Sequence, residues 1–430
     1  IRRQRQMCIR DRAYGFGTIE LPNGGNIYTN TLNTIMKASN LKPERKNAWE
    51  IGLDFRTFKN RLNLDVTYYK ENTKDQIMEI ATPWVSGIST QLINAGNIQN
   101  QGIELALNTI PFQNEDWEWG LDFTWTKNTS KIVELHPDAA EYISLAGQVN
   151  AYDYRIGSVA KVGGSYGMLM TDILPARDDQ GRVLLNYSDT RRAVYERRSG
   201  VVQELGDMQP DFLGSMSTSL RWKNLSLHVG LDMRIGGLVA MYSNRYGSNA
   251  GWTKTSLKYR DAASGGLTWT SQYAGGSNGI TYEDGVILEG VFAPGTSATG
   301  IDGKSHDISG MTHQQAIDAG IIEPTHASAY HVFRNSWGEG VVNDDWVHEL
   351  SYIALRDITL SYRMPKSIAS KIGAKGLNLS LAARNVGYIY NSLPNNVHPE
   401  SVRGNRSAEF RIRGYEPYIR NYTFTINAEF

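Results

Sequence analysis

The chain has 430 residues, enough for one large architecture or for two or three domains, and its 44 Lys and Arg balance 44 Asp and Glu. This balance argues against nucleic acid as a partner, because nucleic-acid-binding domains are usually basic. No apolar run reaches the roughly 18 residues that a membrane helix needs. Helical spans are thereby excluded, but a transmembrane β-barrel is not, since its strands alternate between lipid and lumen and read as polar overall.

The first twelve residues, IRRQRQMCIRDR, hold five arginines, one aspartate and the single cysteine, Cys8. A secretory signal is excluded because no continuous apolar run follows. The remainder carries 39 basic and 43 acidic residues, which gives no support to a nucleic-acid-binding arm. MCIRDR is also the translation of a transposase end sequence used in preparing DNA libraries. We therefore interpret residues 1–12 as sequencing-adapter read-through, and Cys8 as uninformative about redox compartment.

Strict alternation of apolar and polar residues predicts β-strands from residue 49 onward. In chain order, the first strands are predicted at 49–56, 61–69, 102–108 and 118–126. The first two are joined by TFKN and read as a hairpin.

The same period predicts further strands at 216–222, 225–235, 352–362, 377–385 and 421–430. The strand at 352–362 changes phase between Arg356 and Ile358, which predicts a β-bulge. Between strands, the short joints TFKN, IPFQNED, WKN and MPKSIASKIGAK alternate with long joints at 136–210 and 240–348.

Short turns alternating with long loops are typical of an outer-membrane barrel, with turns in the periplasm and loops outside the cell. Aromatic residues near strand ends suit the interfacial girdles of such a barrel, and these are Trp49, Trp119, Trp125, Tyr362 and Tyr422. A soluble all-β protein also alternates apolar and polar residues, so this alternative stays open.

Several motifs could suggest enzyme or metal chemistry. G-x-S-x-G occurs at 163–167 and 275–279, but no helical period follows either site, as a nucleophile elbow requires. His348–Glu349 lacks the second histidine of a zinc motif. Asp178–Asp179 and Asp344–Asp345 could hold calcium in a loop, yet read more simply as solvated turns. We predict no catalytic residue, no metal site and no cofactor.

One short loop helix is predicted in MTHQQAIDAGIIEP. Thr312 and Gln315 form a capping box, Gly320 is a suitable terminator, and Pro324 lies just beyond. The helix could fold over a barrel mouth, contact a partner, or only stiffen its loop. Outside this loop, His228 lies on the polar face of a strand and is predicted to be a lumen-facing, hydrogen-bonding side chain.

An ordered series of segments resembles the barrel strands of SusC-like TonB-dependent outer-membrane transporters. The segments are NLKPERKNAWEIGLDF, RLNLDVTYYKENTKDQI, NAGNIQNQGIELAL, LGDMQPDFLGSMSTSL, YIALRDITLSYRMPKSI, ARNVGYIYNSLPNNVHPES and the last strand. The resemblance runs from about Asn40 to the C-terminus. It implies an all-β fold in which residues 13–430 form the C-terminal part of the β-barrel, about ten strands of 22. The plug domain, the TonB-contacting segment and the first barrel half would then lie upstream.

The resemblance also implies a function. Its members import oligosaccharides, or in some cases peptides, across the cell outer membrane, with a SusD-like surface lipoprotein as lid and energy from the TonB complex. Phe430 resembles the terminal aromatic residue that barrel-assembly machinery recognises. As an incomplete barrel, the chain is expected to have two open edge strands.

Aromatic faces bind sugars by stacking, and the loop after Ile235 is rich in them. We therefore predict as substrate-binding candidates Tyr242, Tyr246, Trp252, Tyr259, Trp269, Tyr273 and Tyr282. The alternative is a secreted or surface-anchored all-β protein that holds glycans with the same loops but transports nothing.

Overall fold

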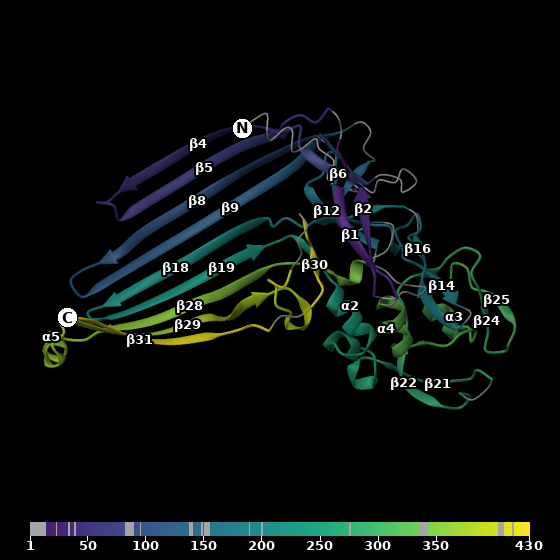
Figure 1. Ribbon diagram of the computed structural model, residues 1–430. Coiled ribbons are helices and arrows are strands. Elements are labelled where there is room, and N and C mark those ends of the chain that lie inside the picture. The colour runs from purple at the N-terminus through teal and green to yellow at the C-terminus, as the bar shows by residue number, and fades with distance from the viewer. Residues whose placement is uncertain are drawn as a thin grey trace.

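The computed structural model describes residues 14–22, 24–32, 35–37, 40–81, 90–94, 96–136, 141–147, 149, 155–188, 190–198, 201–274, 277–335, 343–402, 408–414 and 417–430. A long curved sheet forms one part, and shorter strands and helices gather at one end of it (Figure 1). The adapter interpretation of residues 1–12 falls outside the described residues. No helix within the described ranges is long and apolar enough to cross a membrane.

Nine strands form the large sheet in the part of the chain that is described, and every neighbouring pair in it is antiparallel. Its order is β31-β29-β28-β19-β18-β9-β8-β5-β4. The bounds are β4 (Arg45–Thr57), β5 (Leu62–Lys74), β8 (Gly96–Gln113), β9 (Trp117–Leu135), β18 (Phe212–Trp222), β19 (Leu225–Ile235), β28 (Tyr352–Arg363), β29 (Gly376–Asn391) and β31 (Asn421–Glu429). Each corresponds to a strand predicted from the alternation.

The sheet has nine strands where about ten were expected, and the described residues do not close it into a barrel. Its two edges are β4 and β31, each paired on one side only. Open edges are the arrangement predicted for an incomplete barrel.

Short connections lie at one end of the sheet and long ones at the other. Residues 58–61, 114–116 and 223–224 make three of the short turns, and the fourth carries α5 (Lys366–Ala369) and η6 (Ser370–Ile372). In the turn before β5, Phe58, Lys59 and Asn60 have φ of 54°, 58° and 64°. Such left-handed backbone reverses the chain in little space.

A β-bulge interrupts β28 at the predicted position. Asp357 pairs with Gly230 and Leu355 with Leu231, so Arg356 has no counterpart on β19. The pairing of β28 with β29 shifts at the same place. The bulge places Arg356 within reach of side chains on the polar face.

The N-terminal segments and the β5–β8 connection form two small sheets. β1 (Tyr14–Glu20) pairs with β2 (Asn26–Leu32), and β7 (Thr90–Asn94) lies between β3 (Ile35–Lys37) and β6 (Ile77–Ala81). The β9–β18 connection contains β10 (Tyr142–Gly147), β11 (Ile156–Lys161), β12 (Tyr166–Thr171), β13 (Leu174–Pro175), β14 (Leu184–Ser188), β15 (Arg192–Tyr195), β16 (Arg197–Arg198) and β17 (Gln203–Asp207).

The β19–β28 connection is the longest. It contains β20 (Leu238–Met241), α2 (Tyr242–Asn249), η3 (Lys254–Leu257), η4 (Ala262–Ser264), β21 (Leu267–Thr270), β22 (Thr281–Val286), β23 (Val291–Phe292), β24 (Ser297–Thr299), β25 (Ser305–Asp307), α3 (His313–Asp318), β26 (Thr325–His326), α4 (Ala327–Asn335), η5 (Asp344–Trp346) and β27 (Val347–Glu349). The β29–β31 connection carries η7 (Pro394–Asn396) and β30 (Arg411–Ile412).

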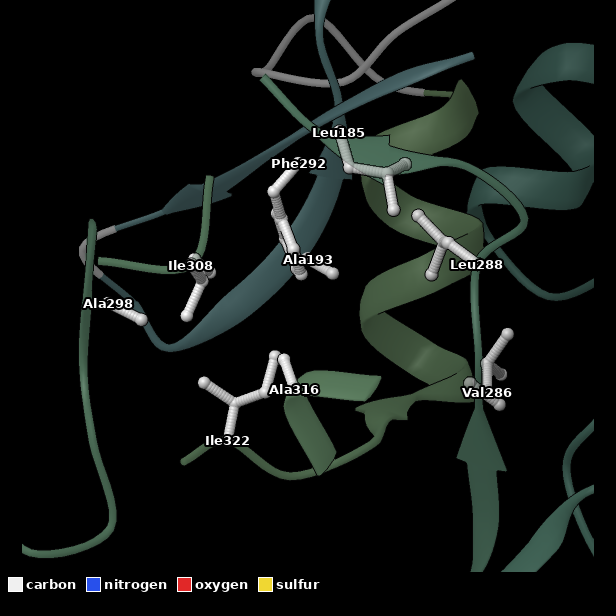
Figure 2. Packing of buried hydrophobic residues seen from close by; sticks show 10 residues of the cluster. Leu185, Ala193, Val286, Leu288, Phe292, Ala298, Ile308, Ala316 and Ile322 are labelled. Atoms are coloured by element: carbon white, nitrogen blue, oxygen red, sulfur yellow. The ribbon is translucent and has the colours of Figure 1, made fainter. Parts of the chain in front are cut away.

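Two of the long connections fold together around one apolar core. Leu185 and Ala193 come from the first, and Phe292, Ala316 and Ile322 are among the residues that come from the second (Figure 2). β14 and β23 pair in parallel and join the two segments. We call residues 183–198 and 281–331 the loop body, since they share this core.

The predicted loop helix is confirmed as α3. Thr312 Oγ1 accepts the Gln315 backbone N–H at 3.1 Å, and Gln315 Oε1 accepts the Thr312 N–H at 2.8 Å, which completes the capping box. Gly320 follows with φ of 68° and donates to the Ile317 carbonyl. Ala316 points into the core of the loop body, so the helix stiffens that body.

Candidate substrate-binding surface

The apolar face of the large sheet is uncovered. Leu53 is 60% exposed and Phe424 63% exposed, at opposite edges of the sheet. Among the described residues, the sheet contributes to the buried clusters near its loop ends, for example with Ile98 and Ile132. A broad apolar face left open along whole strands is typical of a surface that contacts lipid.

Aromatic side chains gather toward both ends of this face. Trp117 and Trp222 stack at the turn end with centroids 5.6 Å apart. Nearer the loop ends, Trp49 lies 5.3 Å from Tyr68, and Trp125 6.1 Å from Phe212. The other predicted girdle residues, Trp119, Tyr362 and Tyr422, are exposed. Aromatic bands at two levels suit the two interfaces of a bilayer.

The opposite face is polar and its side chains are linked across strands. Asp122 on β9 accepts from Asn108 on β8 at 2.8 Å and from Ser217 on β18 at 3.1 Å. Thr124 and Ser215 are linked at 2.7 Å. His228, predicted to be hydrogen-bonding, lies 3.3 Å from Asp357. This face suits contact with water and a hydrophilic solute.

One hollow lies on the polar face of β4, β5, β8 and β9, with a volume of about 610 Å³. Tyr69 spans it, since its ring lies close over Gly102 and its hydroxyl donates to Asn128 at 3.0 Å. We call this the inner-wall hollow. Its lining is Ala48, Trp49, Glu50, Thr67, Tyr69, Glu71, Asn100, Glu104 and Asn128.

A second hollow, of about 820 Å³, lies where the loop end of β29 meets the connections. We call it the loop-end hollow. Four stretches of the chain line it, and these are residues 252–254, 387–391, 395–398 and 418–420. The lining comprises Trp252, Thr253, Lys254, Gly387, Tyr388, Ile389, Asn391, Asn395, Asn396, Val397, His398, Tyr418 and Arg420.

Three rings pack together at this hollow. Tyr388 and Tyr418 lie 5.2 Å apart, and His398 lies 5.6 Å from Tyr388 and 5.1 Å from Tyr418. His398 Nδ1 accepts the backbone N–H of Glu400 at 3.1 Å. The Tyr418 hydroxyl has no hydrogen-bond partner among the described residues.

The bulge residue anchors the segment that forms one side of the hollow. Arg356 donates to Glu400 through Nη2 at 2.6 Å and Nη1 at 2.9 Å, and it also pairs with Asp232 at 2.5 Å. The Tyr388 hydroxyl donates to Glu400 at 2.9 Å. Hydrogen bonds from Arg356 hold the pKa of Glu400 below its usual range. The loop is therefore fixed to the sheet by charge as well as by packing.

The seven candidate aromatic residues do not form one site. Tyr242 is 2% exposed and packs against Trp346 with centroids 4.9 Å apart. Tyr273 is 7% exposed, and its hydroxyl lies 2.7 Å from that of Tyr187. Both rings thus hold the connections together. Tyr259 contacts Tyr330 edge-on at 5.5 Å beside the loop body.

Trp269 and Tyr282 form a separate pair, stacked at 5.1 Å and flanked by His326. Tyr246 is exposed on α2. Trp252 is the most open of the seven, at 85% exposure, and it lies in the loop-end hollow. The prediction therefore missed this hollow's other members, Tyr388, His398 and Tyr418. For Tyr388 and His398 the signal was the run YIYNSLPNNVHPES, which is unusually rich in Tyr and Asn.

Two of the remaining motifs have structural roles. Residues 163–167 contain the turn between β11 and β12 and lead into a strand. Asp178 Oδ1 accepts the backbone N–H groups of Gln180 and Arg182, as expected of a hairpin turn. Residues 275–276 and the side chain of Asp344 lie outside the described residues. Phe430 is 72% exposed at the end of the chain, and its carbonyl accepts from Lys375 at 2.9 Å.

Comparison with known proteins agrees with this geometry. Residues 12–168 match the family described as TonB dependent receptor-like, beta-barrel. TonB-dependent receptor P3 of Formosa agariphila is 22% identical over 414 residues, which is 91% of this chain and 34% of that protein. SusC of Bacteroides thetaiotaomicron is 22% identical over 224 residues, 50% of this chain and 22% of SusC.

Among solved structures, that of the RagAB peptide transporter matches with a TM-score of 0.59 at 16% identity. The match covers 97% of this chain and 38% of the RagAB chain, and it shows the fold. The chain thus spans about a third of the length of receptor P3 and of the RagAB chain.

The sheet and these matches define an outer-membrane protein of the β-barrel class. Within that class, residues 12–168 match the TonB-dependent receptor β-barrel family, and the chain is similar to receptor P3 and to SusC. The resemblance found in the sequence is confirmed, and so is the outer-membrane location.

Proposed function

We propose that residues 13–430 are the C-terminal part of a TonB-dependent importer that takes up glycans, with peptides as the second substrate class. The single observation that carries this proposal is the large sheet with its two unlike faces. One face leaves apolar side chains such as Leu53 and Phe424 open, and the other links polar side chains across strands. A wall between lipid and a hydrophilic passage needs both faces.

The proposal assigns about half of a 22-stranded barrel to this chain. It is supported by the open edges at β4 and β31 and by the length of the chain relative to its relatives. The plug, the TonB-contacting segment and the other strands would be supplied by the rest of the protein. Residue Phe430 would then serve the barrel-assembly machinery.

The proposed partners are a SusD-like surface lipoprotein and the TonB complex. The loop body gives the lipoprotein a firm surface, because it has its own core at the end of the sheet where the long connections gather (Figure 1). The peptide class is kept because RagAB, a peptide transporter, shares the fold. Glycans are placed first because Trp252 presents an open ring beside the amides of Asn391, Asn395 and Asn396.

The competing function, a surface or secreted glycan-binding protein without transport, requires the apolar face to be covered by a core. In the described residues that face is open, which favours transport.

The two functions are separated by expressing the complete receptor gene in cells that lack their own copy. We expect the protein in the outer-membrane fraction and uptake of labelled oligosaccharide that stops when the proton-motive force is collapsed. A protein released to the medium, or binding without energy-dependent uptake, would contradict the proposal.

A further inference from the structure

We propose that the loop-end hollow is a binding subsite for acidic oligosaccharides, whose carboxylate or sulfate groups pair with Lys254 and Arg420. This inference rests on the proposed function and narrows its substrate class. It stands on the charge of the lining, on the open ring of Trp252 and on the contrast with the inner-wall hollow.

The lining of the loop-end hollow contains two cations and no carboxylate. Lys254 and Arg420 are both exposed, and neither forms an ion pair with a described acidic residue. Glu400, two residues after the lining residue His398, is already engaged by Arg356 and by the Tyr388 hydroxyl. Two uncompensated cations at the rim of one hollow favour an anionic ligand.

The rest of the lining suits a sugar. Trp252 is 85% exposed, so a pyranose ring can stack on its face without displacing protein. Three asparagines line the same hollow and offer amide donors and acceptors for hydroxyl groups; Asn391 and Asn395 also bind backbone or side-chain groups of the loop. The volume of about 820 Å³ is in the range of small-molecule sites, about 300–1,000 Å³.

The inner-wall hollow has the opposite charge. It is lined by Glu50, Glu71 and Glu104 and by no lysine or arginine. Lys46, outside that lining, pairs with Glu71 at 2.5 Å. Binding of an acidic oligosaccharide in the inner-wall hollow is thus disfavoured by these carboxylates. Of the two hollows, the loop-end hollow is therefore the one whose charge favours binding of an anion.

The test measures binding to the complete receptor in detergent by titration calorimetry. The probes are tetragalacturonate, a sulfated galactose tetrasaccharide, carboxyl-reduced tetragalacturonate and tetraglutamate. We expect at least one charged saccharide to bind about tenfold tighter than the neutral one, since two exposed ion pairs contribute about that factor together. Preference between the first two probes tells whether carboxylate or sulfate is read.

Variants locate the binding. Lys254→Gln combined with Arg420→Gln should lose the tenfold preference and keep the affinity for the neutral probe. Trp252→Ala should weaken all saccharides about fivefold to tenfold, and Trp252→Phe should restore most of this. Lys304→Gln, which removes an exposed charge from the loop body, is the matched control and should change nothing. All of these side chains are exposed, so the variants should fold.

Equal binding of charged and neutral saccharides, no binding of any, or an unchanged double variant would overturn the inference. So would tetraglutamate binding as tightly as tetragalacturonate without loss in Trp252→Ala, because the ligand would then be an acidic peptide. The proposed function is tested separately, by measuring energy-dependent uptake of labelled oligosaccharide. Uptake of neutral glycans alone would leave that function standing while this inference fails.

Discussion

The large sheet and the loop body follow opposite rules of burial within one chain. In the loop body, Phe292 is 1% exposed and surrounded by apolar neighbours, as in any water-soluble domain. In the sheet, Phe424 is 63% exposed, and the hydrogen-bonded polar side chains lie on the other face. The same hydrophobic effect explains both if the sheet faces lipid and the loop body faces water. The two burial patterns therefore reflect the two solvents that the protein contacts, which are lipid and water.

The largest expected effect comes from emptying the loop-body core. Phe292→Ala should destabilise the loop body by about 3–5 kcal/mol, the usual result for a buried Phe. Native-state hydrogen exchange of the β14 and β15 amides measures this local free energy. Phe424→Ala, the same change on the exposed face of the sheet, should leave those amides unaltered. If both substitutions changed the exchange of these amides equally, the loop body would not have a core separate from the sheet.

A charge on the lipid face should be nearly as costly. Phe424→Arg is expected to destabilise the folded receptor by about 2–4 kcal/mol, since an arginine near mid-membrane loses its hydration. Thr425→Arg is the matched control, because Thr425 is the next residue on β31, is also exposed, and lies on the polar face. Unfolding in vesicles by urea gives both values. If the two variants were equally stable, the apolar face would not contact lipid.

Acid should weaken the loop body through His313. Its side chain is fully buried, its Nδ1 accepts from the Leu288 backbone at 3.0 Å, and burial lowers its pKa from 6.5 to about 4. The unfolded chain therefore binds a proton below about pH 6.5 that the folded state refuses until about pH 4. The free energy of unfolding of the loop body should therefore be highest above pH 6.5 and should fall by up to about 3 kcal/mol on acidification to pH 4.

Hydrogen exchange of the loop body between pH 7 and pH 4, corrected for the intrinsic rate, measures this slope. In His313→Gln the part of the slope due to this residue should vanish. A slope that persists unchanged in the variant would show that other groups cause it.

The smallest expected effect tests the close packing on the polar face of the sheet. A Cβ at Gly102 would lie 2.5 Å from both the Tyr69 hydroxyl and the Lys127 carbonyl oxygen, whereas a Cβ at Gly52 would lie 3.5 Å from Thr67 Oγ1. Gly102→Ala should thus cost about 1–3 kcal/mol, as overpacking does, and Gly52→Ala much less. The stabilities of the two variants are compared by their refolding yields and urea unfolding midpoints in vesicles. Equal urea midpoints for the two variants would contradict tight packing at Gly102, because both Tyr69 and the backbone at Lys127 would then have to give way without cost.

The elements that follow from local pattern were predictable from the sequence. Period-two alternation located all nine strands of the sheet, and a phase change located the bulge at Arg356. The capping box of Thr312 and Gln315 located α3. Each of these signals lies within a few residues of the element that it predicts.

Contacts between distant segments were not predictable in the same way. The parallel pairing of β14 with β23, and of β20 with β30, joins stretches roughly a hundred or more residues apart and leaves no local period. For the same reason the burial of Tyr242 and Tyr273 could not be distinguished from the exposure of Trp252. The loop-end hollow combines four stretches of chain, and only its aromatic composition was visible in advance.

The separate core of the loop body has a consequence for how the protein can change. Because Leu185, Phe292 and Ile322 are packed against one another and away from the membrane wall, substitutions on the outer surface of the loop body leave the sheet untouched. In the proposed orientation, that surface faces the outside of the cell. A receptor built this way can change the sequence of its outer surface while the sheet stays the same.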